Sequence, residues 1–100
     1  MRIMLSGAND IVTDRMRTYT EYKMFTSIAR YGALVRAVYV TLQRRGRKRE
    51  GFLCGVVIDL GRSGQIKIQA RGGHPIAAID RVCERAGRLL SRRDAQSISS

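Results

Sequence analysis

The sequence predicts an α+β fold in the order β-α-β-β-β-α, with a four-stranded mixed sheet and two helices packed on one of its faces. Three observations lead to this prediction. Four segments alternate apolar and polar residues with the period of a strand, two segments repeat apolar residues at helical spacing, and turn-forming or charged stretches separate them. Strands that alternate in this way leave one face of the sheet in water, so the two helices are expected to cover the other.

The first strand and the first helix occupy the N-terminal third of the chain. Residues 2–6 alternate, and Gly7 with the turn residues that follow it ends the strand. Thr13 is suited to cap a helix, and Asp14 is suited to its first turn. The helix ends at Gly32. Its apolar stripe consists of Met16, Thr20, Met24, Ser27, Ile28 and Tyr31.

Three further strands follow in succession. Alternation runs through residues 34–43, 51–60 and 65–71, and short connections join these segments. Such a succession predicts an antiparallel meander. The first strand, the helix after it and the second strand should form a right-handed crossover, which makes one pair of strands parallel.

The second helix begins after the segment GGHP, because proline is suited to the first position of a helix. An apolar stripe at helical spacing then holds this helix on the sheet. Its members are Ile76, Ile79, Val82, Cys83, Ala86, Leu89 and Leu90. We expect a single domain over residues 1–94, which is long enough to build one core, and a disordered tail over residues 95–100.

Positive charge dominates the composition. Nineteen Lys and Arg residues against eight Asp and Glu residues give a formal net charge of +11 and a pI near 11.0. An excess of this size attracts polyanions, and the planar guanidinium group of arginine suits phosphate oxygens and base edges. Nucleic acid is therefore the leading class of partner, ahead of an anionic membrane surface.

Other classes of protein are excluded or disfavoured. The chain has no run of about 18 apolar residues that could cross a membrane, and its first residues lack a secretory signal, so we expect a cytoplasmic protein. Cys54 and Cys83 are expected to be buried and reduced. His74, the one histidine, is expected to help cap the second helix, and with two scattered cysteines it makes no metal site. We expect no cofactor and no enzymatic activity.

One face of the second predicted helix is crowded with arginine. The four side chains recur at spacings of four, three and four residues: Arg81, Arg85, Arg88 and Arg92. Like charges at these spacings repel each other by roughly 0.2–0.5 kcal/mol per pair on an exposed helix, which favours a polyanion-binding face over an ordinary solvated one. The face lies opposite the apolar stripe, so we expect these side chains to point straight away from the domain.

Two other segments extend the predicted RNA-binding surface. The connection RRGRKRE predicts a phosphate-binding arm, with a solubilising hairpin tip as the alternative. Its cations are Arg44, Arg45, Arg47, Lys48 and Arg49. The first helix adds Arg15, Lys23 and Arg30. Tyr22 is expected on the outward face of that helix, either to stack on an unpaired base or to cover the edge of the sheet.

Three stretches carry a family resemblance. They are LSG in the first strand, VTDRMRTYTEYK at the start of the first helix, and AAIDRVCERAGRLLSRR in the second helix. Together with the element order, they make the chain similar, from about Arg2 to Arg93, to the short form of the ribosome hibernation-promoting factor / ribosome-associated inhibitor family. The resemblance implies a fold akin to double-stranded RNA-binding domains.

The resemblance also implies a function. Members of that family enter the small ribosomal subunit during stress or stationary phase and occupy the channel of messenger and transfer RNA, so translation stops and the ribosome is preserved. The implied partners are the small subunit and its ribosomal RNA, with no membrane and no small-molecule substrate. The residues that would hold RNA phosphates are Arg81, Arg85, Arg88, Arg92 and Arg93 on the second helix, and Arg15, Tyr22, Lys23 and Arg30 on the first.

The chain also departs from the family pattern. The loop RRGRKRE is more basic than the pattern, and HP stands where an acidic or aromatic pair commonly precedes AAID. These departures leave open whether the protein promotes or prevents the pairing of ribosomes. Two other hypotheses also stay open: a free-standing RNA-binding module or RNA chaperone, and an adaptor whose arginines meet an acidic protein.

Overall fold

The computed structural model describes residues 1–8, 10–46 and 51–99, the last four of them by their backbone alone. It confirms the predicted order β-α-β-β-β-α. The elements in chain order are β1 (Arg2–Gly7), α1 (Asp14–Ile28), the 3-10 helix η1 (Ala29–Tyr31), β2 (Ala37–Arg44), β3 (Phe52–Asp59), the 3-10 helix η2 (Gly61–Ser63), β4 (Gln65–Gly72) and α2 (Pro75–Ser99).

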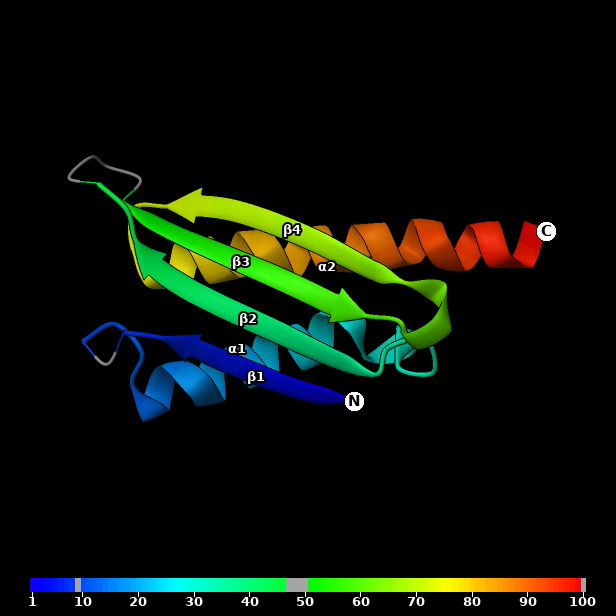
Figure 1. Cartoon of the computed structure of the whole chain (residues 1–100), viewed down its shortest axis with the longest axis horizontal. Helices are drawn as coiled ribbons and strands as arrows, with labels where there is room; N and C mark the ends of the chain where they lie inside the picture. Colours follow the sequence, from blue (N-terminus) through cyan, green and yellow to red (C-terminus); the bar gives the residue numbers. More distant parts are fainter. Residues whose placement is uncertain (9, 47–50, 100) are drawn as a thin grey trace.

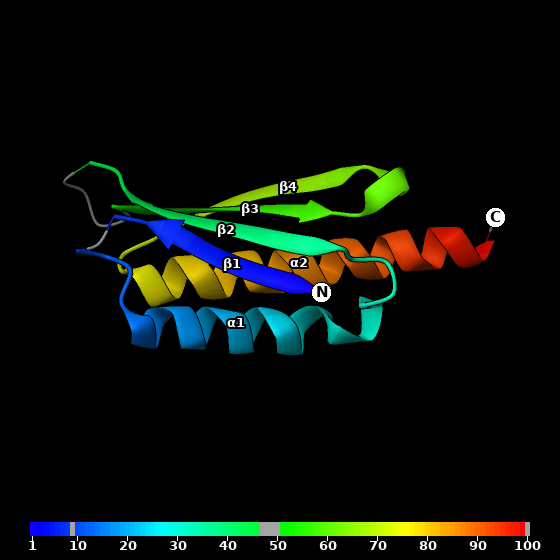
Figure 2. The same cartoon turned by 60° about the horizontal axis from the view of Figure 1, so that its bottom comes forward.

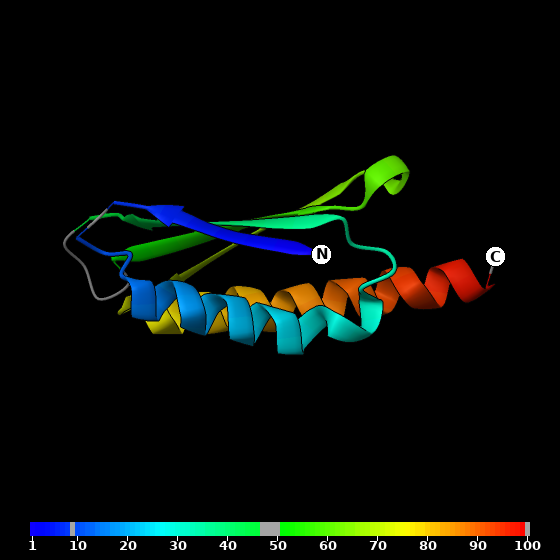
Figure 3. The same cartoon turned by 90° about the horizontal axis from the view of Figure 1, so that it is seen from below.

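The four strands form one sheet in the order β1-β2-β3-β4 (Figure 1). β1 runs parallel to β2, and the other two pairs are antiparallel, so the predicted parallel pair and meander are both confirmed. Both helices lie on the same side of the sheet, and the opposite face is left uncovered (Figures 2 and 3). β1 and β4 are therefore the two open edges of the sheet.

The core lies between the sheet and the helices. One row of its side chains crosses all four strands through Leu5, Val40, Val56 and Ile68. The helices bury Met24 and Ile28 from α1, and Ile79, Val82, Ala86 and Leu90 from α2. Side chains of this kind contribute roughly 1.5–3 kcal/mol each when fully buried, so the alternation seen in the sequence is what holds the layers together.

The start of each helix follows the sequence signals. The hydroxyl of Thr13 accepts a hydrogen bond of 3.2 Å from the backbone N–H of Met16, which is the predicted N-cap of α1. α2 begins at Pro75, as predicted. The backbone carbonyl of His74 accepts from the N–H of Ala78 at 3.3 Å, so His74 closes the first turn through its backbone.

The end of α2 differs from the prediction. A disordered tail was expected from residue 95, but the backbone of α2 continues as a helix to Ser99. This C-terminal part extends past the end of the sheet (Figure 1). Hydrogen bonds within a helix do not depend on a covering sheet, and the sequence there has no glycine or proline to stop it. Ser100 lies outside the described residues.

Candidate nucleic-acid interface

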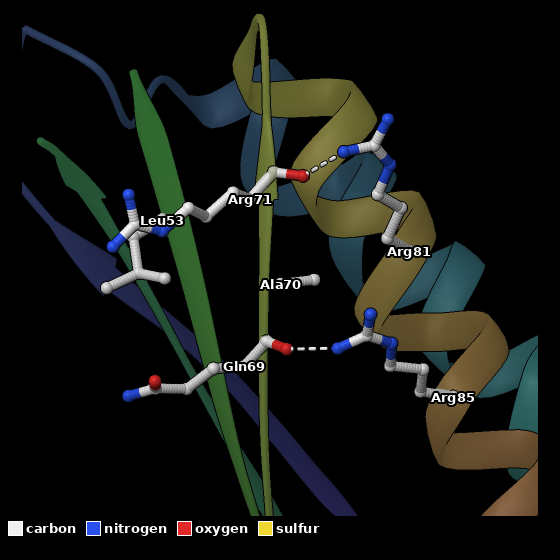
Figure 4. A pocket seen from close by; sticks show the side chains of 6 residues that line it. All are labelled: Leu53, Gln69, Ala70, Arg71, Arg81 and Arg85. Carbon is white, nitrogen blue, oxygen red and sulfur yellow. Dashed lines mark hydrogen bonds between the residues drawn. The ribbon is translucent and has the colours of Figure 1, made fainter. Parts of the chain in front are cut away.

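α2 directs two of its arginines sideways, toward the nearest strand. The Arg85 guanidinium donates from Nη1 to the backbone carbonyl of Gln69 at 2.5 Å, and Arg81 donates from Nη1 to the carbonyl of Arg71 (Figure 4). Both side chains are exposed. The prediction that all four arginines of this face point straight away from the domain is therefore wrong for Arg81 and Arg85.

The geometry of an edge strand explains this difference. β4 has a partner only on the β3 side, so the backbone groups of alternate residues face outward without a neighbouring strand. Two residues of an antiparallel strand span about 6.8 Å, and four residues of a helix span about 6 Å. The four-residue spacing of Arg81 and Arg85 therefore matches the spacing of two successive outward carbonyls, those of Arg71 and Gln69.

Two other arginines of the helices also donate to backbone carbonyls, one in η2 and one in β1. Further along α2, Arg93 donates from Nη1 to the carbonyl of Ser63 at 3.1 Å. At the opposite edge, Arg17 of α1 donates to the carbonyl of Leu5 in β1. Arg17 was not among the residues singled out from the sequence, because helical spacing alone does not reveal which arginine reaches an edge strand. Each open edge of the sheet is thus bound by arginine from the helix beneath it.

The other two arginines of α2 remain available to a ligand. Arg88 and Arg92 are exposed, and in the described part of the chain neither makes a side-chain hydrogen bond or an ion pair. Arg88 shares a groove between the two helices with Arg30, whose guanidinium carbon lies 5.9 Å from the centre of the Tyr31 ring. The groove, which Glu84 also lines, thus combines one cation from η1 and one from α2 with an aromatic side chain. Cations beside an aromatic ring are suited to a nucleotide.

The predicted residues of α1 fall on two sides of that helix. Arg30, which lies in η1 just after the end of α1, lines the groove between the helices with Arg88, whereas Tyr22 of α1 lines a hollow on the other side with Met1, Ile3 and Phe25. Tyr22 is 67% exposed and lies beside β1, which agrees with its predicted alternative of covering the edge of the sheet. Arg15 is exposed and Lys23 is half-buried.

The connection between β2 and β3 is described only at its base. Arg44 forms an ion pair of 3.9 Å with Asp10, and its guanidinium carbon lies 5.4 Å from the centre of the Phe52 ring. Both charged partners are well exposed, so this ion pair contributes little to stability. Arg45 donates from Nε to the side-chain oxygen of Gln43 at 3.3 Å. The predicted arm also includes Arg47, Lys48 and Arg49, which lie outside the described residues.

A hydrogen bond between the helices fixes their relative position. The Tyr19 hydroxyl of α1 donates to Oδ1 of Asp80 in α2 at 2.5 Å. This bond, together with burial, raises the pKa of Tyr19 to about 12. The Asp80 carboxylate, which lies beside the arginines of α2 in the sequence, is thus bound by Tyr19. α1 and α2 are therefore joined close to the groove that Arg30 and Arg88 share.

The two cysteines are free and fully buried, as predicted. Burial is the main reason that the pKa of Cys54 and that of Cys83 rise to about 12, so both thiols stay protonated and unreactive. Within the described ranges, no group of three His, Cys, Asp or Glu residues is placed to hold a metal ion. None of the described helices is long and apolar enough to span a membrane.

Comparisons with known proteins agree with this architecture. The structure of a ribosomal subunit interface protein from Coxiella burnetii matches with a TM-score of 0.76 and 16% identity, over 95% of this chain and 99% of that one. The N-terminal domain of Protein Y from Thermus thermophilus matches with a TM-score of 0.67 and 24% identity, over 91% and 93% of the two chains. These likenesses confirm the predicted fold.

The sequence comparison is more specific. No curated protein sequence matches the chain closely enough to count as a relative. A family model, described as Sigma 54 modulation protein / S30EA ribosomal protein, matches residues 3–97. This match covers both helices, all four strands and the whole arginine face of α2. The chain therefore belongs to the Sigma 54 modulation protein / S30EA ribosomal protein family.

Proposed function

We propose that this protein binds the small ribosomal subunit through ribosomal RNA and blocks the channel of messenger and transfer RNA. It would thereby inhibit translation and preserve ribosomes under stress or in stationary phase, in the cytoplasm and without a cofactor or an enzymatic step. The observation that carries the proposal is the family match over residues 3–97. The name of the Coxiella burnetii neighbour, a ribosomal subunit interface protein, supports the same partner.

The charge of the protein suits this partner. A net charge of +11 on 100 residues favours association with the phosphate backbone of RNA, where each neutralised phosphate releases bound counterions. Arg88 and Arg92 lie on the outer side of α2, and Arg30 joins Arg88 from the end of α1. We assign the main phosphate contacts to these three residues.

The remaining cations have supporting roles in this proposal. Arg81, Arg85 and Arg93 each use a guanidinium donor on a backbone carbonyl, and a guanidinium group has five donors. The other donors of Arg85 and Arg93 are assigned to RNA phosphates, so that the same side chain binds the backbone and the ligand. Arg15, Lys23 and the sequence RRGRK at residues 44–48 with Arg49 contribute further positive charge, and Tyr22 adds an exposed ring beside β1.

Sedimentation of the protein with purified ribosomes tests the proposal. The wild-type chain should travel with small subunits and whole ribosomes in a sucrose gradient. The double variant Arg88→Glu with Arg92→Glu should bind at least about tenfold more weakly, because it replaces two phosphate contacts by repulsion. The matched control Arg36→Glu with Arg62→Glu makes the same change in net charge at exposed positions outside α2, and it should sediment with ribosomes.

Each outcome of this experiment separates the hypotheses. Loss of binding in the α2 variant but not in the control supports the proposal. Equal loss in both variants would show a non-specific charge effect. A wild-type chain that stays at the top of the gradient yet binds RNA in solution would favour the free-standing RNA-binding module or RNA chaperone.

A further inference from the structure

The uncovered face of the sheet carries an exposed apolar row. The side chains that point to this face belong to alternate residues of the strands, opposite to those in the core. In the strand register, Met4, Tyr39 and Val57 lie side by side on β1, β2 and β3. Tyr39 is 43% exposed and Met4 is 38% exposed. Tyr39 thus lies on an inner strand of the sheet. Both helices lie on the other side of that sheet (Figure 2).

Cations surround this row. Lys67 of β4 continues it as the direct neighbour of Val57, and Arg71 lies opposite Leu53 on the same face, four residues further along β4. Arg2 occupies the same face at the beginning of β1. All three charged side chains are exposed.

The same face carries one carboxylate among the described strands. Asp59 is the only acidic residue in the four strands. It is half-buried, and its Oδ1 accepts a hydrogen bond of 2.8 Å from the N–H of Gly61. The face therefore combines an exposed ring with three exposed cations against one half-buried carboxylate. This charge complements a nucleic acid better than it complements a protein surface of mixed charge.

A groove at the edge of β4 joins this face to the arginines of α2. Leu53 and Arg71 lie on one side of the strand, and Arg81 and Arg85 lie on the other (Figure 4). Since the groove is lined from both sides, the positive surface continues around the edge of the sheet. A flexible chain of phosphates can follow this path, whereas a rigid duplex cannot bend around an edge of this size.

We propose that the uncovered sheet face binds single-stranded RNA, with Tyr39 stacked on an unpaired base and Lys67, Arg71 and Arg2 against the adjoining phosphates. Stacking on an aromatic side chain tolerates any base and requires that the base be unpaired. The inference extends the proposed function, because it adds a second RNA-binding face on the side of the sheet opposite the helices. The observations behind this inference are the position of Tyr39 on the uncovered sheet face and the charges around it. They do not depend on binding to the ribosome.

Fluorescence anisotropy with the full chain tests this proposal. The probes are a labelled oligo-uridine of about 12 nucleotides and a labelled, blunt-ended RNA duplex of about 12 base pairs, both at low salt. Tyr39→Val removes the ring but keeps a residue that favours strands, and Tyr39→Phe keeps the ring. Tyr39→Val should weaken oligo-uridine binding by about fivefold or more and leave duplex binding nearly unchanged, whereas Tyr39→Phe should bind both probes like the wild type.

The outcomes distinguish this inference from the ribosomal proposal. Oligo-uridine binding that is equal in Tyr39→Val and wild type, with both proteins folded, would overturn the inference, as would Tyr39-dependent binding of an acidic peptide in place of oligo-uridine. If the wild type fails to sediment with ribosomes but its oligo-uridine binding depends on the Tyr39 ring, the ribosomal proposal fails and this inference stands. Loss of ribosome binding in Arg88→Glu with Arg92→Glu, while Tyr39-dependent binding of oligo-uridine persists, supports two separate faces.

Discussion

Tyr19 of α1 donates a hydrogen bond of 2.5 Å to Asp80 of α2 and so links the two helices directly. A hydrogen bond to a charged group contributes about 1.5–3 kcal/mol, and partial exposure lowers that contribution. Tyr19→Phe should therefore reduce the free energy of unfolding by about 1 kcal/mol in urea titrations followed by circular dichroism. Tyr22→Phe is the matched control, because the Tyr22 side chain is mostly exposed. Equal stability of Tyr19→Phe and the control would contradict the assigned role.

Stability should fall at high pH. The pKa values of Tyr19, Cys54 and Cys83 are raised to about 12, from ordinary values of 10.0 for tyrosine and 9.0 for cysteine. The unfolded chain loses these protons at lower pH than the folded protein, so the folded state holds more protons between about pH 9 and 12. The free energy of unfolding should therefore decrease as the pH rises through that range. Tyr19→Phe should show a shallower decrease above about pH 10.

The buried hydroxyl of Thr20 predicts a stabilising substitution. Thr20 is fully buried on the inner face of α1, and its hydroxyl has no hydrogen-bond partner among the described residues. Thr20→Val keeps the shape of the side chain and removes the unsatisfied polar group. The free energy of unfolding should rise by about 1 kcal/mol, which thermal unfolding would detect. Thr18→Val is the control, because Thr18 is exposed and its hydroxyl already donates to the Asp14 carbonyl at 3.1 Å.

The arginines that bind the β4 edge should protect it from other strands. In Arg81→Ser with Arg85→Ser, the carbonyls of Gln69 and Arg71 lose their guanidinium donors and become open to pairing. This variant should self-associate more than the wild type in analytical ultracentrifugation. Arg88→Ser with Arg92→Ser removes the same charge without exposing the edge, and its association state should match the wild type. If both variants associate equally, net charge rather than the edge controls solubility.

Salt should weaken the interaction with RNA in proportion to the number of phosphates bound. A protein that neutralises roughly 6–10 phosphates loses about 10³–10⁵ in affinity between 50 and 200 mM salt. Each of Arg88→Gln and Arg92→Gln should lower the slope of log affinity against log salt by about 1. Anisotropy titrations at several salt concentrations measure that slope. A wild-type affinity that does not change with salt would remove both RNA hypotheses and favour an acidic protein partner.

Much of this architecture is predictable from local patterns. Alternation in the strands identifies the residues of the core row, and Thr13 and Pro75 mark the starts of the two helices because caps depend on local geometry. The directions of Arg81 and Arg85 are not predictable in this way. A helical wheel places them opposite the apolar stripe, but their direction is decided by two carbonyls of an edge strand that lies ten or more residues away in sequence.

Local patterns also do not predict which side chains lie next to one another on the uncovered face of the sheet. Alternation predicts that Tyr39 faces water, yet its significance depends on neighbours from three other strands, which only the register brings together. For Tyr22, the exposure was predicted but the position relative to the other predicted residues was not. Its exposure was predicted from the helix, and its neighbours Met1, Ile3 and Phe25 place it by β1 rather than among the arginines of α2.

The carbonyl contacts of Arg81 and Arg85 also bear on the entropy of binding. A free arginine side chain carries about 2 kcal/mol of rotamer entropy, which it loses when a ligand immobilises it. In this protein the backbone of β4 restricts both guanidinium groups before any ligand arrives. The conformational entropy of these two side chains is therefore lost when the protein folds and not when a ligand binds. A phosphate that binds them contacts donors whose spacing the strand has already fixed.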